Sequence, residues 1–173
     1  MSNYIPKNLE FDQPITTISK AVKSTLGPRG KTSIIESPEH VGGMTITKDG
    51  VTVATSIFLD DPVENLAVQM LKDAARRTAN SAGDGTTTAI VLTEAIIKAG
   101  EEFLTPKHNI SEVVKEINSL SQQVVESLLD QSKEVTPSRL LDVATISANN
   151  DHALGKIIAD AYNQVGKNGI VTV

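Results

Sequence analysis

Apolar positions along the chain recur mostly at three- and four-residue steps, the period of an amphipathic helix. The strongest of these runs follows Asp61-Pro62-Val63-Glu64, which combines a capping aspartate, a proline in the first turn and a glutamate three residues after the cap. Gly83 and Gly100 are expected to end this helix and the next one. In chain order, the pattern predicts helices at residues 15–26, 62–82, 87–99 and 111–128, a shorter one that opens at 136–137, and one at 151–165.

Two short β-branched stretches interrupt the helical period. Thr32–Ile35 and Met44–Thr47 flank a segment with a proline and two glycines, so they predict two strands around a turn. The predicted fold class is therefore mainly α with a short β-hairpin. Ile170–Val173 is a further strand pattern after a Lys-Asn-Gly turn. Because a lone apolar strand needs a partner, we expect the sequence to be a piece of a longer polypeptide.

The composition limits the possible chemistry. The 173 residues include no cysteine, which excludes disulfide scaffolds, cysteine-ligated metal sites and thiol nucleophiles. With three Phe, two Tyr and no Trp, the core must be built from Val, Ile, Leu and Ala. The net charge of −5 predicts no general attraction to nucleic acid or to an anionic membrane. No apolar run is long enough for a membrane span and no targeting signal is recognised, so we expect a cytoplasmic protein.

The densest chemical signal is the run from Gly83 to Thr88, Gly-Asp-Gly-Thr-Thr-Thr, between two predicted helices. Its glycines allow a tight turn and a close approach to a ligand, and the free N–H groups of the next helix favour anions. Asp84 adds a carboxylate suited to Mg²⁺ beside phosphates, and the threonine hydroxyls can donate to phosphate oxygens. The alternative is a glycine-terminated helix followed by a threonine cap, but consecutive threonines are poor helix formers.

A second signal is the segment TLGPRGKT at residues 25–32. It ends like a Walker A loop, but that loop requires glycine where Thr25 stands and a strand where the pattern is helical. A P-loop NTPase is therefore disfavoured. Two interpretations remain: a plain helix stop, which the segment alone favours, or a Gly-Pro turn that binds phosphate through its exposed N–H groups and basic neighbours.

A third signal, weaker alone, is Thr47-Lys48-Asp49-Gly50. It is either an Asp-Gly β-turn or a second carboxylate for water or metal next to a lysine that contacts phosphate. The three histidines show no ligand spacing, and Arg76-Arg77 is expected on the solvated side of its helix.

Five segments in this order carry a family resemblance: TLGPRGKT, TITKDGVTVA, AGDGTTTA, TISANND and VGKNGIVTV. Over about residues 19–173, the chain resembles the N-terminal part of a group I chaperonin, the GroEL type. KDG and TISAN favour the bacterial and organellar group over the archaeal and eukaryotic cytosolic one. The resemblance implies the N-terminal half of a helical equatorial domain at 1–130 and the first part of an α+β intermediate domain at 131–173. By the same resemblance, we expect the apical domain and the C-terminal equatorial half of such a protein to lie outside this sequence.

The resemblance also implies an activity and its residues. Such chaperonins are isomerase-class ATPases that bind ATP and Mg²⁺ and couple hydrolysis to the folding of non-native proteins. Asp49 would help place the attacking water, Asp84 would coordinate Mg²⁺, and Ile146 would touch the nucleotide from the domain junction. The other implied nucleotide contacts are Thr25, Leu26, Gly27, Pro28, Lys48, Gly50, Gly85, Thr86, Thr87 and Thr88.

The implied partners are other copies of the chain in a ring of stacked heptamers, with unfolded clients and a co-chaperonin bound through the absent apical domain. Residues before Ser19 and at 38–43 depart from the family pattern, and one interpretation is a divergent, phage-borne member. Because half of the ATP pocket is missing, we expect the isolated chain to be inactive. The alternative function is a non-enzymatic helical assembly or interaction module derived from a chaperonin.

Overall fold

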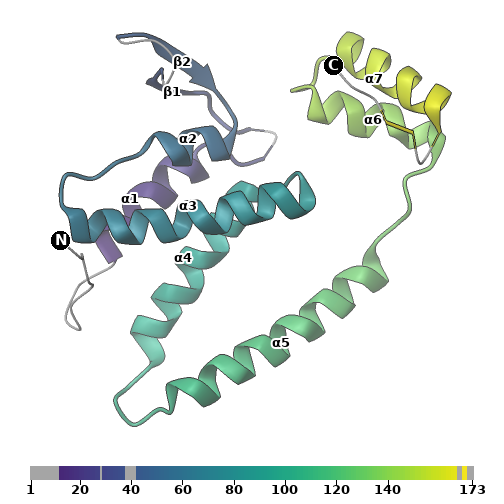
Figure 1. The fold of residues 1–173 in the computed structure, drawn as a ribbon. Coiled ribbons are helices and arrows are strands. Elements are labelled where there is room, and N and C mark those ends of the chain that lie inside the picture. Colours follow the sequence, from purple (N-terminus) through teal and green to yellow (C-terminus); the bar gives the residue numbers. More distant parts are fainter. Residues whose placement is uncertain (1–11, 28, 38–41, 167–168, 171–173) are drawn as a thin grey trace. The chain divides into compact units, whose positions relative to one another are not determined.

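The computed structural model describes residues 12–27, 29–37, 42–166 and 169–170, which form seven helices and a two-stranded sheet (Figure 1). The predicted mainly helical fold with a short hairpin is confirmed. Packing divides the chain into two compact units, residues 1–108 and 109–173. The domain boundary expected after residue 130 stays a prediction, and residues 171–173 of the expected last strand lie outside the described residues. No helix in the described ranges is long and apolar enough to cross a membrane.

Four helices of the first unit enclose its core: α1 (Asp12–Lys23), α2 (Gly50–Ser56), α3 (Pro62–Ala82) and α4 (Thr86–Phe103) (Figure 1). Every buried residue of the core is aliphatic, as the composition predicts. These residues are Ile15, Ile18, Val22, Val53, Ala54, Ala67, Val68, Leu71, Ala75 and Ile90. The loop after α1, the start of α2 and the turn between α3 and α4 come together beside this core.

The start and stop signals of α3 act as the sequence predicts. The Asp61 carboxylate accepts hydrogen bonds from the backbone N–H groups of Val63 and Glu64, at 2.8 and 3.0 Å. Gly83 ends the helix with a left-handed φ of 72°, a conformation that glycine adopts without steric cost.

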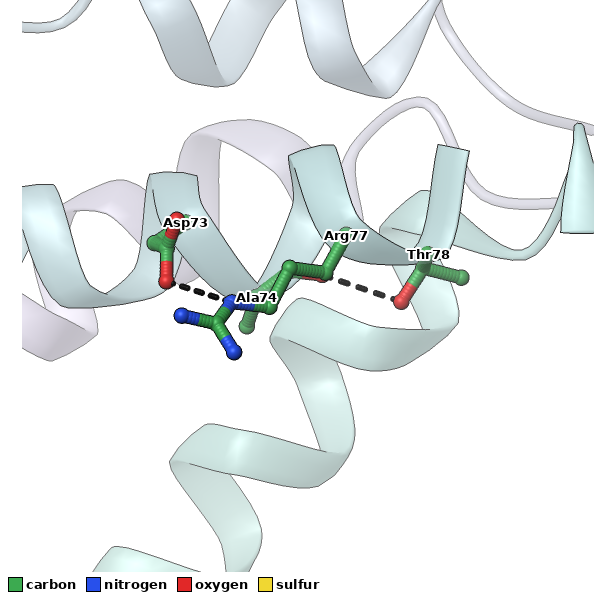
Figure 2. Close-up of polar contacts among 4 residues, drawn as sticks. All are labelled: Asp73, Ala74, Arg77 and Thr78. Atoms are coloured by element: carbon green, nitrogen blue, oxygen red, sulfur yellow. Dashed lines mark hydrogen bonds and ion pairs between the residues drawn. The ribbon is translucent and has the colours of Figure 1, made fainter. Parts of the chain in front are cut away.

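The exposed side of α3 carries its arginines. Arg77 Nε lies 2.7 Å from Asp73 Oδ2, one helical turn earlier, and the dashed line in Figure 2 marks this ion pair. The Arg77 side chain is 81% exposed and Arg76 is also exposed, so the expected solvated position is confirmed. On the same turn the Thr78 hydroxyl donates to the carbonyl of Ala74 at 2.9 Å.

The hairpin consists of β1 (Ser33–Glu36) and β2 (Met44–Thr47), which are antiparallel with Ile34 opposite Ile46. This confirms the predicted pair of strands. β2 leads through Lys48 and Asp49 directly into α2.

The main differences from the prediction are two helix ends and one additional helix. α1 ends at Lys23 rather than Leu26, because the backbone N–H and the hydroxyl of Thr25 both turn back to the Val22 carbonyl. α4 continues through Gly100 to Phe103, since one glycine costs a helix only about 1 kcal/mol. α2 was not predicted, because its β-branched residues are unfavourable helix formers and its start is set by a cap.

In the second unit, α6 (Pro137–Ser147) and α7 (His152–Val165) pack as a pair. A β-carbon on the buried Gly155 would lie 2.6 Å from the Thr145 Cα atom, so only glycine permits this close approach. The link between the helices has positive φ at Asn149 and Asn150, 56° and 65°, which asparagine tolerates better than most residues.

The remaining helix of this unit, α5 (Ile110–Gln131), has no buried residue in the described part of the chain. The apolar stripe predicted on one of its faces is present, but its members are 41% to 59% exposed. They are Val114, Ile117, Leu120, Val124 and Leu128. This face therefore lacks a partner within the described residues.

Candidate functional site

The three chemical signals of the sequence meet in one pocket of the first unit. The pocket has a volume of about 230 Å³ and lies where the loop after α1, the junction of β2 with α2, and the turn between α3 and α4 come together. Its lining residues are Thr25, Leu26, Gly27, Lys48, Asp49, Gly50, Asp84, Gly85, Thr86, Thr87 and Thr88. Segments more than 50 residues apart in sequence thus form one site.

The loop after α1 is held by backbone hydrogen bonds. The Lys31 N–H donates to the Ser24 carbonyl at 2.7 Å, and the Gly30 N–H donates to the Gly27 carbonyl at 2.9 Å. Gly27 has a left-handed φ of 77°, and a β-carbon on Gly30 would lie 2.1 Å from the Thr25 carbonyl oxygen. Gly30 does not line the pocket, but its close approach to Thr25 shapes the loop that does.

At the junction of β2 with α2, Asp49 is the helix cap and not part of a β-turn. Its Oδ2 atom accepts hydrogen bonds from the backbone N–H and the hydroxyl of Thr52, at 2.8 and 2.5 Å. The Asp-Gly β-turn considered from the sequence is therefore wrong. Lys48 and Asp49 are both exposed in the pocket.

The turn between α3 and α4 places Asp84 between two glycines with left-handed φ, Gly83 and Gly85. The Asp84 carboxylate accepts a hydrogen bond from the Gly85 N–H at 2.6 Å. Asp84 therefore lies at the turn of a packed helix pair, as the sequence predicts.

α4 begins with unpaired donors. Gly85 is its cap and supplies no side chain, so the threonine-cap alternative is wrong. The first helical bond joins the Ala89 N–H to the Gly85 carbonyl, which leaves three preceding N–H groups without a helical acceptor. They belong to Thr86, Thr87 and Thr88. Together with the helix dipole, these groups favour an anion in the pocket.

An ion-pair cluster joins α1 and α4 in the first unit. Glu94 on α4 is 4% exposed and pairs with Lys23 at the end of α1 and with Lys98. Burial alone raises the pKa of Glu94, but the hydrogen bonds from Lys23 and Lys98 outweigh it and hold the pKa below its ordinary value. Because Lys23 is the last residue of α1, the ion pair with Glu94 holds the end of the helix from which the loop with Thr25 begins.

A second buried charge was missed by the sequence analysis. Lys72 on α3 is 1% exposed, its Nζ atom donates to the Thr55 carbonyl at 3.1 Å, and it lies 3.9 Å from the centre of the Phe58 ring. Burial, and then the charge of Arg76, lower the pKa of Lys72. No signal in the apolar pattern of α3 distinguishes this lysine from a solvated one.

The donor set of the pocket fits a magnesium–phosphate ligand better than a metal held by protein alone. No group of three His, Cys, Asp or Glu side chains that could bind a metal occurs among the described residues. Mg²⁺ is commonly bound through one or two carboxylates together with substrate phosphates, and the pocket offers Asp84, Asp49, a lysine and free N–H groups.

Two expected site residues are not placed in this pocket. Pro28 lies outside the described residues. Ile146 lies on α6 of the second unit, where it is 70% exposed, and its role stays a prediction. The second unit has its own larger hollow of about 700 Å³ at the start of α6 and the end of α7, lined by none of the predicted site residues.

The first unit is helical, and three of its loop segments form the pocket. Known proteins share this arrangement. Residues 18–172 match the TCP-1/cpn60 chaperonin family. The chain therefore belongs to this family.

Solved chaperonin structures have the same fold. The chaperonin gp146 from the bacteriophage EL 2 (Pseudomonas aeruginosa), crystallised in two forms in the presence of ATP-BeFx, is 29% identical with a TM-score of 0.78. The match covers 93% of this chain and 28% of that one. A group III chaperonin in the open state is 26% identical with a TM-score of 0.70, over 89% of this chain and 31% of that one. The chain thus spans less than a third of the length of these relatives.

Proposed function

We propose that the chain is the N-terminal part of an ATP-dependent chaperonin subunit that binds Mg-ATP in the pocket of the first unit. The observation that carries this proposal is the convergence of Asp49, Asp84 and the free N–H groups of α4 in one pocket. Phosphoryl transfer to water needs charge neutralisation and positioning more than a covalent nucleophile. A pocket with two carboxylates, one lysine and several backbone donors supplies both.

In this proposal each segment has a role. Asp84 holds Mg²⁺, and Lys48 and the N–H groups of Thr86–Thr88 contact phosphate oxygens. Asp49 positions the attacking water, which makes it the catalytic residue. The loop at Thr25–Gly27 covers the nucleotide, the absence of a side chain at Gly50 leaves space for it, and Ile146 is a further proposed nucleotide contact.

The full-length protein would couple hydrolysis to the folding of non-native proteins. We place it in group I because of its KDG and TISAN segments. Its proposed setting is a cytoplasmic ring of identical subunits, stacked heptamers in that group, with clients and a co-chaperonin bound through an apical domain. The structural match to a chaperonin crystallised with ATP-BeFx supports the nucleotide part of the proposal.

The alternative is a non-enzymatic assembly module. The exposed apolar face of α5 favours it, because a helix with such a face needs a partner. The two functions differ in their dependence on nucleotide, since an assembly module would associate equally well without ATP.

The test compares the full-length protein with the isolated residues 1–173. The full-length protein is expected to bind ATP in the presence of Mg²⁺, to release phosphate in repeated turnovers, and to refold a denatured client only with ATP. The isolated chain is expected to release no phosphate. A full-length protein that neither binds nor hydrolyses ATP would contradict the proposal and favour the assembly module.

A further inference from the structure

The two carboxylate oxygens of Asp49 have different surroundings. Oδ2 accepts both the backbone N–H and the hydroxyl of Thr52. Among the described residues, no hydrogen bond reaches Oδ1. The terminal torsion of an aspartate is soft, so two donors on one oxygen fix a side chain that would otherwise rotate. The free oxygen, Oδ1, is left for whatever enters the pocket.

The Thr52 hydroxyl differs from its neighbours in the same helix. The hydroxyl of Thr55 donates to the carbonyls of Val51 and Thr52, and that of Ser56 donates to the carbonyl of Val53. These bonds to carbonyls of the preceding turn are what such side chains commonly form inside helices. Of these three hydroxyls, only that of Thr52 donates to a side chain, and that side chain belongs to Asp49, which lines the pocket.

The helix cap does not require this hydroxyl. A capping aspartate needs one backbone N–H of the first turn, and the Thr52 N–H at 2.8 Å already provides it. The hydroxyl bond is therefore additional, and its effect is on the orientation of the carboxylate. Thr52 itself does not line the pocket, so any effect on a ligand must pass through Asp49.

We infer that Thr52 is a positioning residue, which holds Oδ2 of Asp49 so that Oδ1 is presented to the attacking water. This inference rests on the proposed ATPase function. It concerns the rate of hydrolysis and not the affinity for nucleotide, because Thr52 makes no contact inside the pocket.

The experiment uses the full-length protein and measures steady-state ATP hydrolysis. Replacing Thr52 with Val keeps the shape and removes the hydroxyl, and kcat is expected to fall about tenfold while KM for ATP stays within about twofold. Thr52→Ser keeps the hydroxyl and is expected to restore kcat. Thr55→Val is the matched control, because it removes a hydroxyl from the same helix that bonds only to backbone carbonyls.

A double-mutant cycle shows whether Thr52 acts through Asp49. In a protein that already carries Asp49→Ala, the further change Thr52→Val should alter the residual kcat by less than about twofold. A merely structural residue would lower kcat by the same factor in both backgrounds. If the Val variant does not fold, Thr52→Ala removes the same hydroxyl, and the same loss of kcat is expected.

The possible outcomes distinguish a failure of the positioning role of Thr52 from a failure of the proposed ATPase function. If the unaltered protein hydrolyses ATP but Thr52→Val keeps full kcat, or loses no more than Thr55→Val, the positioning role is wrong and the proposed function stands. If Thr52→Ser is as slow as Thr52→Val, the hydroxyl is not responsible. If the unaltered protein neither binds nor hydrolyses ATP, the proposed function itself fails.

Discussion

A β-carbon on Gly50 would lie 2.0 Å from the hydroxyl oxygen of Thr87. Gly50 is the buried first residue of α2, and Thr87 lies in the first turn of α4. The imagined carbon would also lie 3.2 Å from the Thr87 Cβ atom and 3.4 Å from a methyl group of Val22. Glycine is thus required here by the lack of space, and it allows the starts of the two helices to meet in the pocket.

Replacing Gly50 with Ala is expected to push the Thr87 hydroxyl out of the pocket. We expect a loss of about 1–3 kcal/mol in the free energy of unfolding and a weaker affinity for Mg-ATP. Thermal unfolding and nucleotide titration measure the two effects. Thr87→Ala removes the obstructing hydroxyl, so in the double variant most of the stability should return while the affinity stays low. An unchanged melting temperature for Gly50→Ala alone would contradict this account.

The two carboxylates of the pocket are expected to have different tasks. Asp84→Ala should weaken the binding of Mg-ATP by about tenfold or more, because it removes the proposed Mg²⁺ ligand. Asp49→Ala should leave binding nearly unchanged and slow hydrolysis by about 10²-fold or more. Calorimetric titration and phosphate release in the full-length protein separate binding from turnover. Equal losses of binding and turnover in both variants would refute this division.

The pairing of Glu94 predicts a dependence of stability on pH. Its pKa is lower in the folded protein than the ordinary value of 4.5, so its stabilising effect is fully present above pH 4.5 and is lost as the pH falls through the folded pKa. Glu94→Gln should lower the free energy of unfolding at pH 7 by about 1 kcal/mol, and this difference should shrink on acidification.

Denaturant unfolding of the unaltered protein and of Glu94→Gln, measured between pH 7 and pH 3, tests this dependence. Glu101→Gln is the control, because Glu101 is exposed on the same helix. A difference between Glu94→Gln and the unaltered protein that stays constant over this range would show that the ion pairs do not contribute.

The isolated chain of 173 residues is expected to associate with itself. The apolar face of α5 is about half exposed in every member, and exposed patches larger than a few hundred Å² favour association or aggregation. Size-exclusion chromatography and calorimetry of the isolated chain measure this. Ile117→Lys and Leu120→Lys, placed on this face, should shift the chain towards monomer. A monomeric chain with a sharp cooperative transition would contradict the expectation.

Much of the fold could be predicted from local patterns, because the helices carry their own start and stop signals. Asp61 and Gly83 delimit α3 through hydrogen bonds and a backbone conformation that depend on those residues alone. α2 could not be predicted, because its β-branched sequence disfavours a helix and its existence depends on the Asp49 cap and on packing against the core.

From the residues alone the pocket was predictable only as three separate segments, and it was the family resemblance that implied one nucleotide site. The sequence identified Asp49, Asp84 and the loop at Thr25–Gly27, and the structure brings them together. Gly30 and Thr52 were missed because their importance lies in a close approach and in a single hydrogen bond. Lys72 was missed because burial of a lysine depends on which groups surround it.

Every lining residue of the pocket lies between Thr25 and Thr88, inside the first unit. A growing polypeptide leaves the ribosome from its N-terminus, and domains tend to fold in that order. A nascent chain that has emerged as far as residue 108 therefore carries all of these residues before the first turn of α5 has left the ribosome. A ligand that binds the folded form at this stage would stabilise it by mass action.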